Sequence, residues 1–277
     1  MRIIETYHLF SEITEKLIIL LRGLDKEQWN LPTCYPSWKV KDIVAHLIQT
    51  AVGRLSLQRD EYFRKSGFSQ QPSFEDLSSV IDHANSSWTD IFSQTSPRIL
   101  LDFLEVTERQ LSDFIQDQDL HSTALYGVSW AGEFKSANWF DLGRDYTERW
   151  HHQQQIREAV GAESLGTNRY LAPVLQLFMY SVPFWYRDVQ ADDGTIIKIQ
   201  ITGDSGGEWS LTCLESQWVL EETSSESSNT IQLTEDVAWR FFTRSQPVES
   251  FRGKIQFSED LELLRHFYQV RAIMIND

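Results

Sequence analysis

The sequence predicts an α+β protein of two domains, a helical bundle over residues 1–189 followed by a smaller α+β domain over residues 190–277. Apolar residues recur at helical spacing through the first two-thirds of the chain. From about residue 190 the pattern changes to short β-branched and aromatic runs separated by turn sequences. A chain of 277 residues is long enough for two domains that each bury a core.

Helical periodicity and its breakers define the elements of the first domain. Pro32 and Pro36 interrupt the chain, and Ser37 is the expected N-cap of the helix that follows. Pro97 suits a first helical turn, and Gly161 suits a helix C-terminus. The helices are expected at residues 4–24, 38–65, 74–92, 97–115, 137–160 and 168–189.

The second domain is expected to contain a sheet and two helices. The runs TIIKIQIT and WSLTC flank the turn sequence GDSGGE, which indicates a β-hairpin. The strands are expected at residues 195–202, 209–213, 217–221, 230–233 and 254–257, and the helices at residues 235–243 and 260–270.

Composition excludes several classes of function. The net charge of −15 repels phosphate backbones, and no basic patch offsets it, so we expect no nucleic-acid partner. Two cysteines far apart in sequence do not form a disulfide framework. The first residues lack the pattern of a signal peptide, and no apolar run is long enough to cross a bilayer. We therefore expect a cytoplasmic protein without a membrane partner.

Glu148 and His152 are four residues apart on the expected helix 137–160. This spacing places both side chains on one helical face, with Asp145 before them and Ile156 after them. Carboxylates and imidazoles are costly to bury unless they are paired or bound to a cation. Because the same face continues into apolar residues, we interpret Glu148 and His152 as candidate metal ligands. An exposed helical ion pair is the alternative, since the same spacing recurs elsewhere in the chain.

Two other histidines require separate interpretation. His46 lies at the edge of the apolar stripe of the helix 38–65, a position that equally fits a half-buried histidine hydrogen-bonded across the bundle. His151 is rejected as a ligand because its face of the late helix is polar and expected to be solvated. The residues that share this face are Arg144, Thr147, Gln155 and Glu158.

Several segments together resemble one protein family. PSWKVKDIVAH, which ends in His46, and ERWHHQQQIREA, which contains Glu148 and His152, resemble two bundle helices of DinB-like proteins and mycothiol-dependent maleylpyruvate isomerases. The segments ITGDSGGEWSL, DVAWRFFTR and FRGKIQFSEDLELL are similar to the small α/β domain of the isomerases, which is related in shape to sterol carrier proteins. The resemblance implies a DinB-like metal-binding bundle followed by a sterol-carrier-like domain. It also implies that His46, Glu148 and His152 bind a divalent metal.

The resemblance further implies the chemistry. The expected metal is Zn²⁺, and Ni²⁺, Fe²⁺ or Mn²⁺ also suit His and Glu ligands. Three protein ligands leave a coordination position open, where a low-molecular-weight thiol can become a nucleophile. The expected function is an S-transferase or isomerase acting on a small electrophilic molecule. A metal-dependent hydrolase and a non-enzymatic small-ligand binding module are the alternatives, and the oligomeric state stays open, with a homodimer as one option.

Two residues are candidates for a catalytic role, and a third marks a departure from the family. Asp145, one turn before Glu148, could orient a ligand or act as a base, with an exposed carboxylate as the alternative. Arg244 could bind an anion in a cleft between the domains, with a surface salt bridge as the alternative. Gln155 stands where family members often carry aspartate, so maleylpyruvate itself is not assumed to be the substrate.

Overall fold

The computed structural model describes residues 2–35, 37–62, 74–223, 225–259 and 261–273, and for residues 74–77 it describes the backbone alone. The contacts between residues divide the chain into two compact units. The helical unit comprises Glu5–Gly127 and Phe134–Leu165. The sheet unit comprises residues 2–4, Val128–Glu133 and Gly166–Ile273. Helices and strands are both present, which confirms the predicted mixed class.

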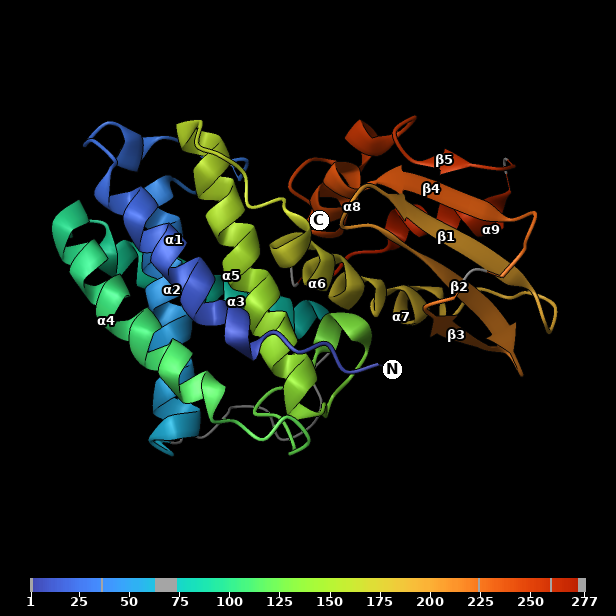
Figure 1. Cartoon of the computed structure of the whole chain (residues 1–277), viewed down its shortest axis with the longest axis horizontal. Coiled ribbons are helices and arrows are strands. Elements are labelled where there is room, and N and C mark those ends of the chain that lie inside the picture. Colours follow the sequence, from blue (N-terminus) through green and yellow to red (C-terminus); the bar gives the residue numbers. More distant parts are fainter. Residues whose placement is uncertain (1, 36, 63–73, 224, 260, 274–277) are drawn as a thin grey trace. The chain divides into compact units, whose positions relative to one another are not determined.

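Long helices that pack side by side build the helical unit (Figure 1). Helix α2 contacts α3, α4 and α5, and α1 contacts α4 and α5. These helices are α1 (Phe10–Arg22), α2 (Val40–Arg54), α3 (Phe74–Phe92), α4 (Pro97–Gln116) and α5 (Asn138–Val160). The short helical turns η1 (Tyr7–Leu9) and η3 (Leu55–Arg59) extend α1 and α2, and η2 (Gln28–Asn30) lies in the connection between these two helices. The apolar stripes seen in the sequence meet in one core, in which Ile43, Leu104 and Ile156 are fully buried.

Helix α2 begins later than the sequence predicts. Ser37 is not its N-cap, because the chain is still extended at Lys39, which forms a β-bridge with Pro32. The carboxylate of Asp42 accepts a hydrogen bond of 2.9 Å from the Lys39 N–H and thereby satisfies one free donor at the helix start. At the other end α2 continues into the π-helical turn η3, and the predicted extension over residues 63–65 lies outside the described residues.

The end of α5 follows its prediction. Gly161 adopts a left-handed conformation with φ 69°, and its N–H bonds to the carbonyl groups of Arg157 and Glu158. Glycine is favoured at this position because it has no Cβ to clash in that conformation. The start of α4 also follows from the residues of its own first turn, where Ser96 is the N-cap and Pro97 occupies the first helical position.

A mixed sheet with the strand order β3-β2-β1-β4-β5 forms one layer of the sheet unit (Figure 1). Strands β1 and β2 form the predicted antiparallel hairpin, with Ile199 opposite Trp209. Strand β1 pairs in parallel with β4, and the remaining pairs are antiparallel. The strands are β1 (Ile196–Thr202), β2 (Gly207–Leu214), β3 (Gln217–Glu221), β4 (Thr230–Thr234) and β5 (Gln256–Phe257).

Helices cover the apolar face of this sheet. Helix α8 (Glu235–Phe242) contacts β1, β4 and α6 (Asn168–Met179). Helix α7 (Val182–Tyr186) packs on β3, and α9 (Glu262–Arg265) continues into the turn η6 (His266–Gln269). The predicted helix 168–189 is thus two helices, because Pro183 in the first turn of α7 has no N–H to continue the ladder of α6.

The division into units differs from the predicted boundary at residue 189. Helices α6 and α7 belong to the sheet unit, as does the segment Val128–Glu133 with its turn η4 (Ser129–Ala131). In this segment Trp130 is buried and lies edge-on to Phe178 of α6. Gly132 has φ 78°, and a Cβ at this position would come within 2.4 Å of the Phe184 ring. The close approach of this backbone therefore requires glycine.

Neither cysteine forms a disulfide bond, and Cys34 is exposed whereas Cys213 is buried in β2. Across the described residues, no helix combines the length and the apolar character that crossing a bilayer would require.

Candidate metal centre

The structure brings together the three predicted ligands inside the helical unit. His46 lies on α2, and Glu148 and His152 lie on α5. Their ligand atoms all lie within 4.8 Å of one another. The Nε2 atom of His152 is 3.3 Å from a carboxylate oxygen of Glu148, and the two imidazole rings meet edge to face at 4.8 Å. Two nitrogen donors and one carboxylate in this arrangement can hold a divalent cation.

A glutamine three residues further along each helix contacts the Nδ1 atom of each histidine. Nδ1 of His152 is 2.9 Å from the Gln155 amide oxygen, and Nδ1 of His46 is 3.4 Å from the Gln49 amide oxygen. A hydrogen bond from Nδ1–H to a carbonyl oxygen leaves the lone pair on Nε2. Each imidazole therefore has a glutamine partner on Nδ1, which makes Nε2 the nitrogen that a metal would bind.

Trp38 lies directly against both imidazole rings. Its ring stacks on His152 with a centroid distance of 5.8 Å and lies tilted against His46 at 5.0 Å. The half-buried indole packs on the core and also forms a wall beside the candidate ligands.

The charges of the candidate ligands suit metal binding at neutral pH. Burial and the neighbouring His152 lower the pKa of His46 to about 3, so its imidazole is neutral and its lone pair is available. Burial opposes the ionisation of Glu148, but the contact with His152 and the other neighbouring histidines outweigh it and lower the pKa of this carboxyl. Glu148 is therefore a carboxylate.

His151 does not lie on a solvated face, which corrects the sequence interpretation. Its side chain is 3% exposed, and Thr147 and Gln155 on the same face are also buried. Helix α5 buries residues on all its sides between Asn138 and Ile156, so helical phase could not separate an inner from an outer face. Among the described residues neither ring nitrogen of His151 has a hydrogen-bond partner, and His151 does not join the ligand cluster.

We expect the metal-free protein to lose stability as the pH falls below about 6.5. Burial and His152 lower the pKa of His151 to about 3, whereas an unfolded histidine has its pKa near 6.5. Between these values the unfolded state binds a proton that the folded state excludes, at a cost of up to about 1.4 kcal/mol per pH unit. Urea unfolding with chelator at pH 7 and pH 5 measures this loss. His151→Gln should make the pH dependence shallower, and an unchanged slope would contradict the assignment.

Asp145 is buried, in contrast to the exposed carboxylate considered as the alternative. One carboxylate oxygen is 2.5 Å from Arg149 Nη1, and the other is 2.7 Å from Arg54 Nε. Burial opposes ionisation of Asp145, but Arg149, Arg54 and Arg144 outweigh it and lower its pKa. Both oxygens are thus engaged by guanidinium groups, and a role for Asp145 as a base stays a prediction.

Asp145 is one member of a group that we call the buried charge network. Arg149 also binds Glu108 of α4 at 2.9 Å, and Arg54 of α2 also binds Asp141 at 3.1 Å. The network ties α5 to both α2 and α4, and so sets where Glu148 and His152 lie relative to His46. The sequence pattern did not reveal this network, although Arg149 directly follows Glu148. Its members are Arg54, Glu108, Asp141, Arg144, Asp145 and Arg149.

Arg244 lies in the sheet unit, just after α8. Its guanidinium donates hydrogen bonds to the carbonyl oxygens of Tyr268 at 2.8 Å and Phe241 at 3.2 Å, and it lies over the Phe241 ring. These contacts are not the surface salt bridge considered as the alternative. The predicted role of Arg244 in binding an anion stays a prediction.

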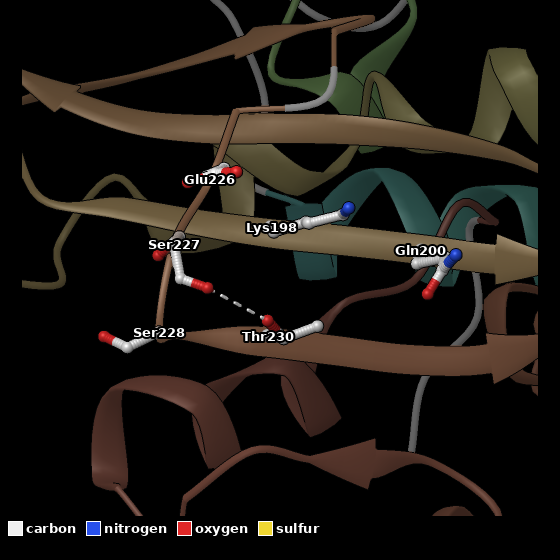
Figure 2. Close-up of a pocket in the computed structure, with 6 residues that line it drawn as sticks. All are labelled: Lys198, Gln200, Glu226, Ser227, Ser228 and Thr230. Atoms are coloured by element: carbon white, nitrogen blue, oxygen red, sulfur yellow. Dashed lines mark hydrogen bonds between the residues drawn. The ribbon is translucent and has the colours of Figure 1, made fainter.

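The polar face of the sheet carries a pocket of about 560 Å³ (Figure 2). Two of its polar side chains are engaged within the sheet unit itself, Lys198 with Glu208 at 3.0 Å and Gln200 with Gln232 at 2.8 Å. The residues that line this pocket include no histidine or cysteine and none of the candidate metal ligands. The lining residues are Lys198, Gln200, Glu226, Ser227, Ser228 and Thr230.

A comparison with models of known protein families gives a match that covers much of the chain. The family model described as the mycothiol maleylpyruvate isomerase N-terminal domain matches residues 10–157, more than half of the chain. The chain belongs to this family. The part that matches the mycothiol maleylpyruvate isomerase N-terminal domain contains His46, Glu148 and His152. The resemblance noted in the sequence is thereby confirmed.

Solved structures of mycothiol-dependent maleylpyruvate isomerase share the fold of this family member. A histidine-to-alanine mutant of that enzyme aligns over 95% of this chain and 96% of its own, with a TM-score of 0.57 and 11% identity. A second structure of that enzyme aligns over 87% and 88%, with a TM-score of 0.54 and 12% identity. At such low identity these matches show the fold alone. No curated protein matches the sequence.

Proposed function

We propose that this protein is a metal-dependent and thiol-dependent isomerase of a small unsaturated acid. The observation that carries the proposal is the cluster of His46, Glu148 and His152, whose ligand atoms lie within 4.8 Å of one another inside the part of the chain that matches the family. Membership in the mycothiol maleylpyruvate isomerase family supports a low-molecular-weight thiol as the second reactant.

The residues present fit a divalent metal. Two imidazoles engaged through Nδ1 and one carboxylate form a donor set of the kind that zinc accepts, and nickel, iron and manganese also suit it. Three protein ligands leave a position free for another molecule, as in catalytic rather than structural zinc sites. Bound there, the metal would supply a Lewis acid that lowers the pKa of a thiol.

The side chains around this site orient the candidate ligands, hold their helices together and shield them from water. Gln49 and Gln155 orient the imidazoles, and the buried charge network holds α5 against α2 and α4. Trp38 shields one side of both imidazole rings from water. A site assembled from rigid helices keeps the thiol and the acceptor in one geometry, which lowers the entropic cost of bringing the two together.

The proposed reaction leaves the thiol unchanged overall. The thiolate sulfur adds to one carbon of the double bond, and the electron pair moves onto the conjugated carbonyl oxygen. Rotation about the resulting single bond follows. The electron pair then returns, and the carbon–sulfur bond breaks to release the thiolate. Atoms and electrons balance without an oxidant or a reductant. If the sulfur stays on the acceptor and a proton is added instead, the outcome is S-transfer.

We expect turnover to require both a thiol and a metal. The purified protein, with and without zinc, is mixed with mycothiol, bacillithiol or glutathione and with maleylpyruvate or a related cis-unsaturated acid, and NMR follows the cis and trans forms. Isomerisation only with thiol and metal together supports the proposal. Ester hydrolysis without a thiol would favour a hydrolase, and bound metal with no turnover across these thiols and acids would favour a binding module.

A further inference from the structure

Three consecutive glutamines on α5 have different partners. Gln153 donates a hydrogen bond of 2.9 Å to the Ile13 carbonyl, and Gln154 accepts one of 2.9 Å from the Leu165 N–H. Gln155 alone of the three contacts an imidazole, with its amide oxygen 2.9 Å from Nδ1 of His152. All three side chains are buried, and Gln155 is only 1% exposed. The run QQQ therefore contains two structural glutamines and one that faces the candidate metal centre.

The contact between Gln155 and His152 determines which ring nitrogen is free. A carbonyl oxygen can only accept, so it selects the imidazole form that carries its proton on Nδ1. Nε2, which is 3.3 Å from the Glu148 carboxylate, is then the nitrogen whose lone pair a metal between the two side chains would bind. The matching contact of His46 with Gln49 is longer, at 3.4 Å, and Gln49 is less buried than Gln155. Gln155 therefore constrains the ring of His152 more strongly than Gln49 constrains the ring of His46.

The Gln155 amide oxygen that accepts from Nδ1 of His152 is also uncharged. A carboxylate at this position would make the imidazole more basic and add a negative charge beside Glu148, whereas an amide does neither. With a neutral acceptor on His152, Glu148 is the one acidic side chain among the three candidate ligands. Such ligands donate less electron density to a metal, so a metal held by them would stay a stronger Lewis acid, at some cost in affinity.

We propose that Gln155 is a positioning residue that holds His152 with Nε2 toward the metal and keeps the metal strongly acidic through its uncharged amide. The proposal rests on the metal site of the proposed function. Its consequence is that Gln155 controls metal affinity without contacting the metal.

The test compares metal affinity, measured by competition with a chelator, across single variants. Gln155→Met removes the acceptor and should weaken metal binding by about 10- to 100-fold. Gln155→Glu restores an acceptor and should bind at least as tightly as the original protein. Gln153→Met is the matched control, since it loses a buried hydrogen bond on the same helix that does not involve a histidine. Thermal unfolding of the metal-free proteins establishes that each variant is folded.

A second readout does not depend on the metal. In ¹⁵N-labelled metal-free protein, NMR reports whether the proton of His152 is on Nδ1, and Gln155→Met should remove its protection from exchange with water. Unchanged affinity and unchanged exchange in Gln155→Met would overturn the proposal, as would an equal loss of affinity in Gln153→Met. If the original protein binds no metal while the Nδ1 proton depends on Gln155, the proposed function fails and the orienting contact stands.

Discussion

Replacing His152 with alanine is expected to abolish stoichiometric metal binding and, with it, thiol-dependent turnover. The substitution removes one of the three candidate ligands and the partner of the Glu148 carboxylate at 3.3 Å. Loss of an outer residue at a metal site commonly costs about 10- to 100-fold in affinity, and loss of a direct ligand should cost more. Elemental analysis should give about one transition metal per chain for the original protein and far less for His152→Ala. We expect the same loss for His46→Ala.

The adjacent histidine supplies the control for this experiment. His151 lies on the same helix and is equally buried, but it is not a member of the ligand cluster. His151→Ala should therefore keep the metal, while any general effect of removing a buried imidazole from α5 appears in both variants. Full metal content in His152→Ala, or its loss in His151→Ala but not in His152→Ala, would show that the cluster is assigned wrongly.

Of the substitutions proposed for this protein, Arg149→Met should cause the largest loss of folding stability. The guanidinium bridges Glu108 of α4 and Asp145 of α5, and its side chain is 4% exposed. Its removal leaves buried carboxylates that have lost an ionic partner, which costs about 3–5 kcal/mol in comparable buried pairs. Urea unfolding of the metal-free protein measures the change. A substitution that keeps the volume of the side chain separates the loss of charge from the loss of packing.

A double-mutant cycle shows whether the loss comes from the ion pair itself. Glu108→Gln in the Arg149→Met background removes one of the stranded carboxylates, so the double variant should be less destabilised than the sum of the two single variants. The exposed pair of Arg109 with Glu15 is the control, and Arg109→Met should cost at most about 1 kcal/mol. A loss of similar size in the Arg109 variant, or strict additivity in the cycle, would contradict a role for the buried charge network.

Much of the secondary structure follows from local sequence pattern. Gly161 ends α5 and Pro97 begins α4 as predicted, because each acts through the backbone conformation of its own turn. The hairpin of β1 and β2 was also predictable, since its strands are joined by a short turn. The start of α2 was not, because the β-bridge between Lys39 and Pro32 depends on the path of the preceding loop. The parallel pairing of β1 with β4 joins strands far apart in sequence and left no signal in either.

The features of the candidate metal centre also divide into those that follow from the sequence and those that depend on the tertiary structure. The sequence by itself determined that Glu148 and His152 share a helical face, because helical spacing is a local property. Only the tertiary structure decided that His46 reaches them, that His151 is buried and that Asp145 is held by Arg54 and Arg149. The physical reason is that burial and pairing depend on what neighbouring helices place opposite a side chain. The spacing of residues along one helix carries no record of those neighbours.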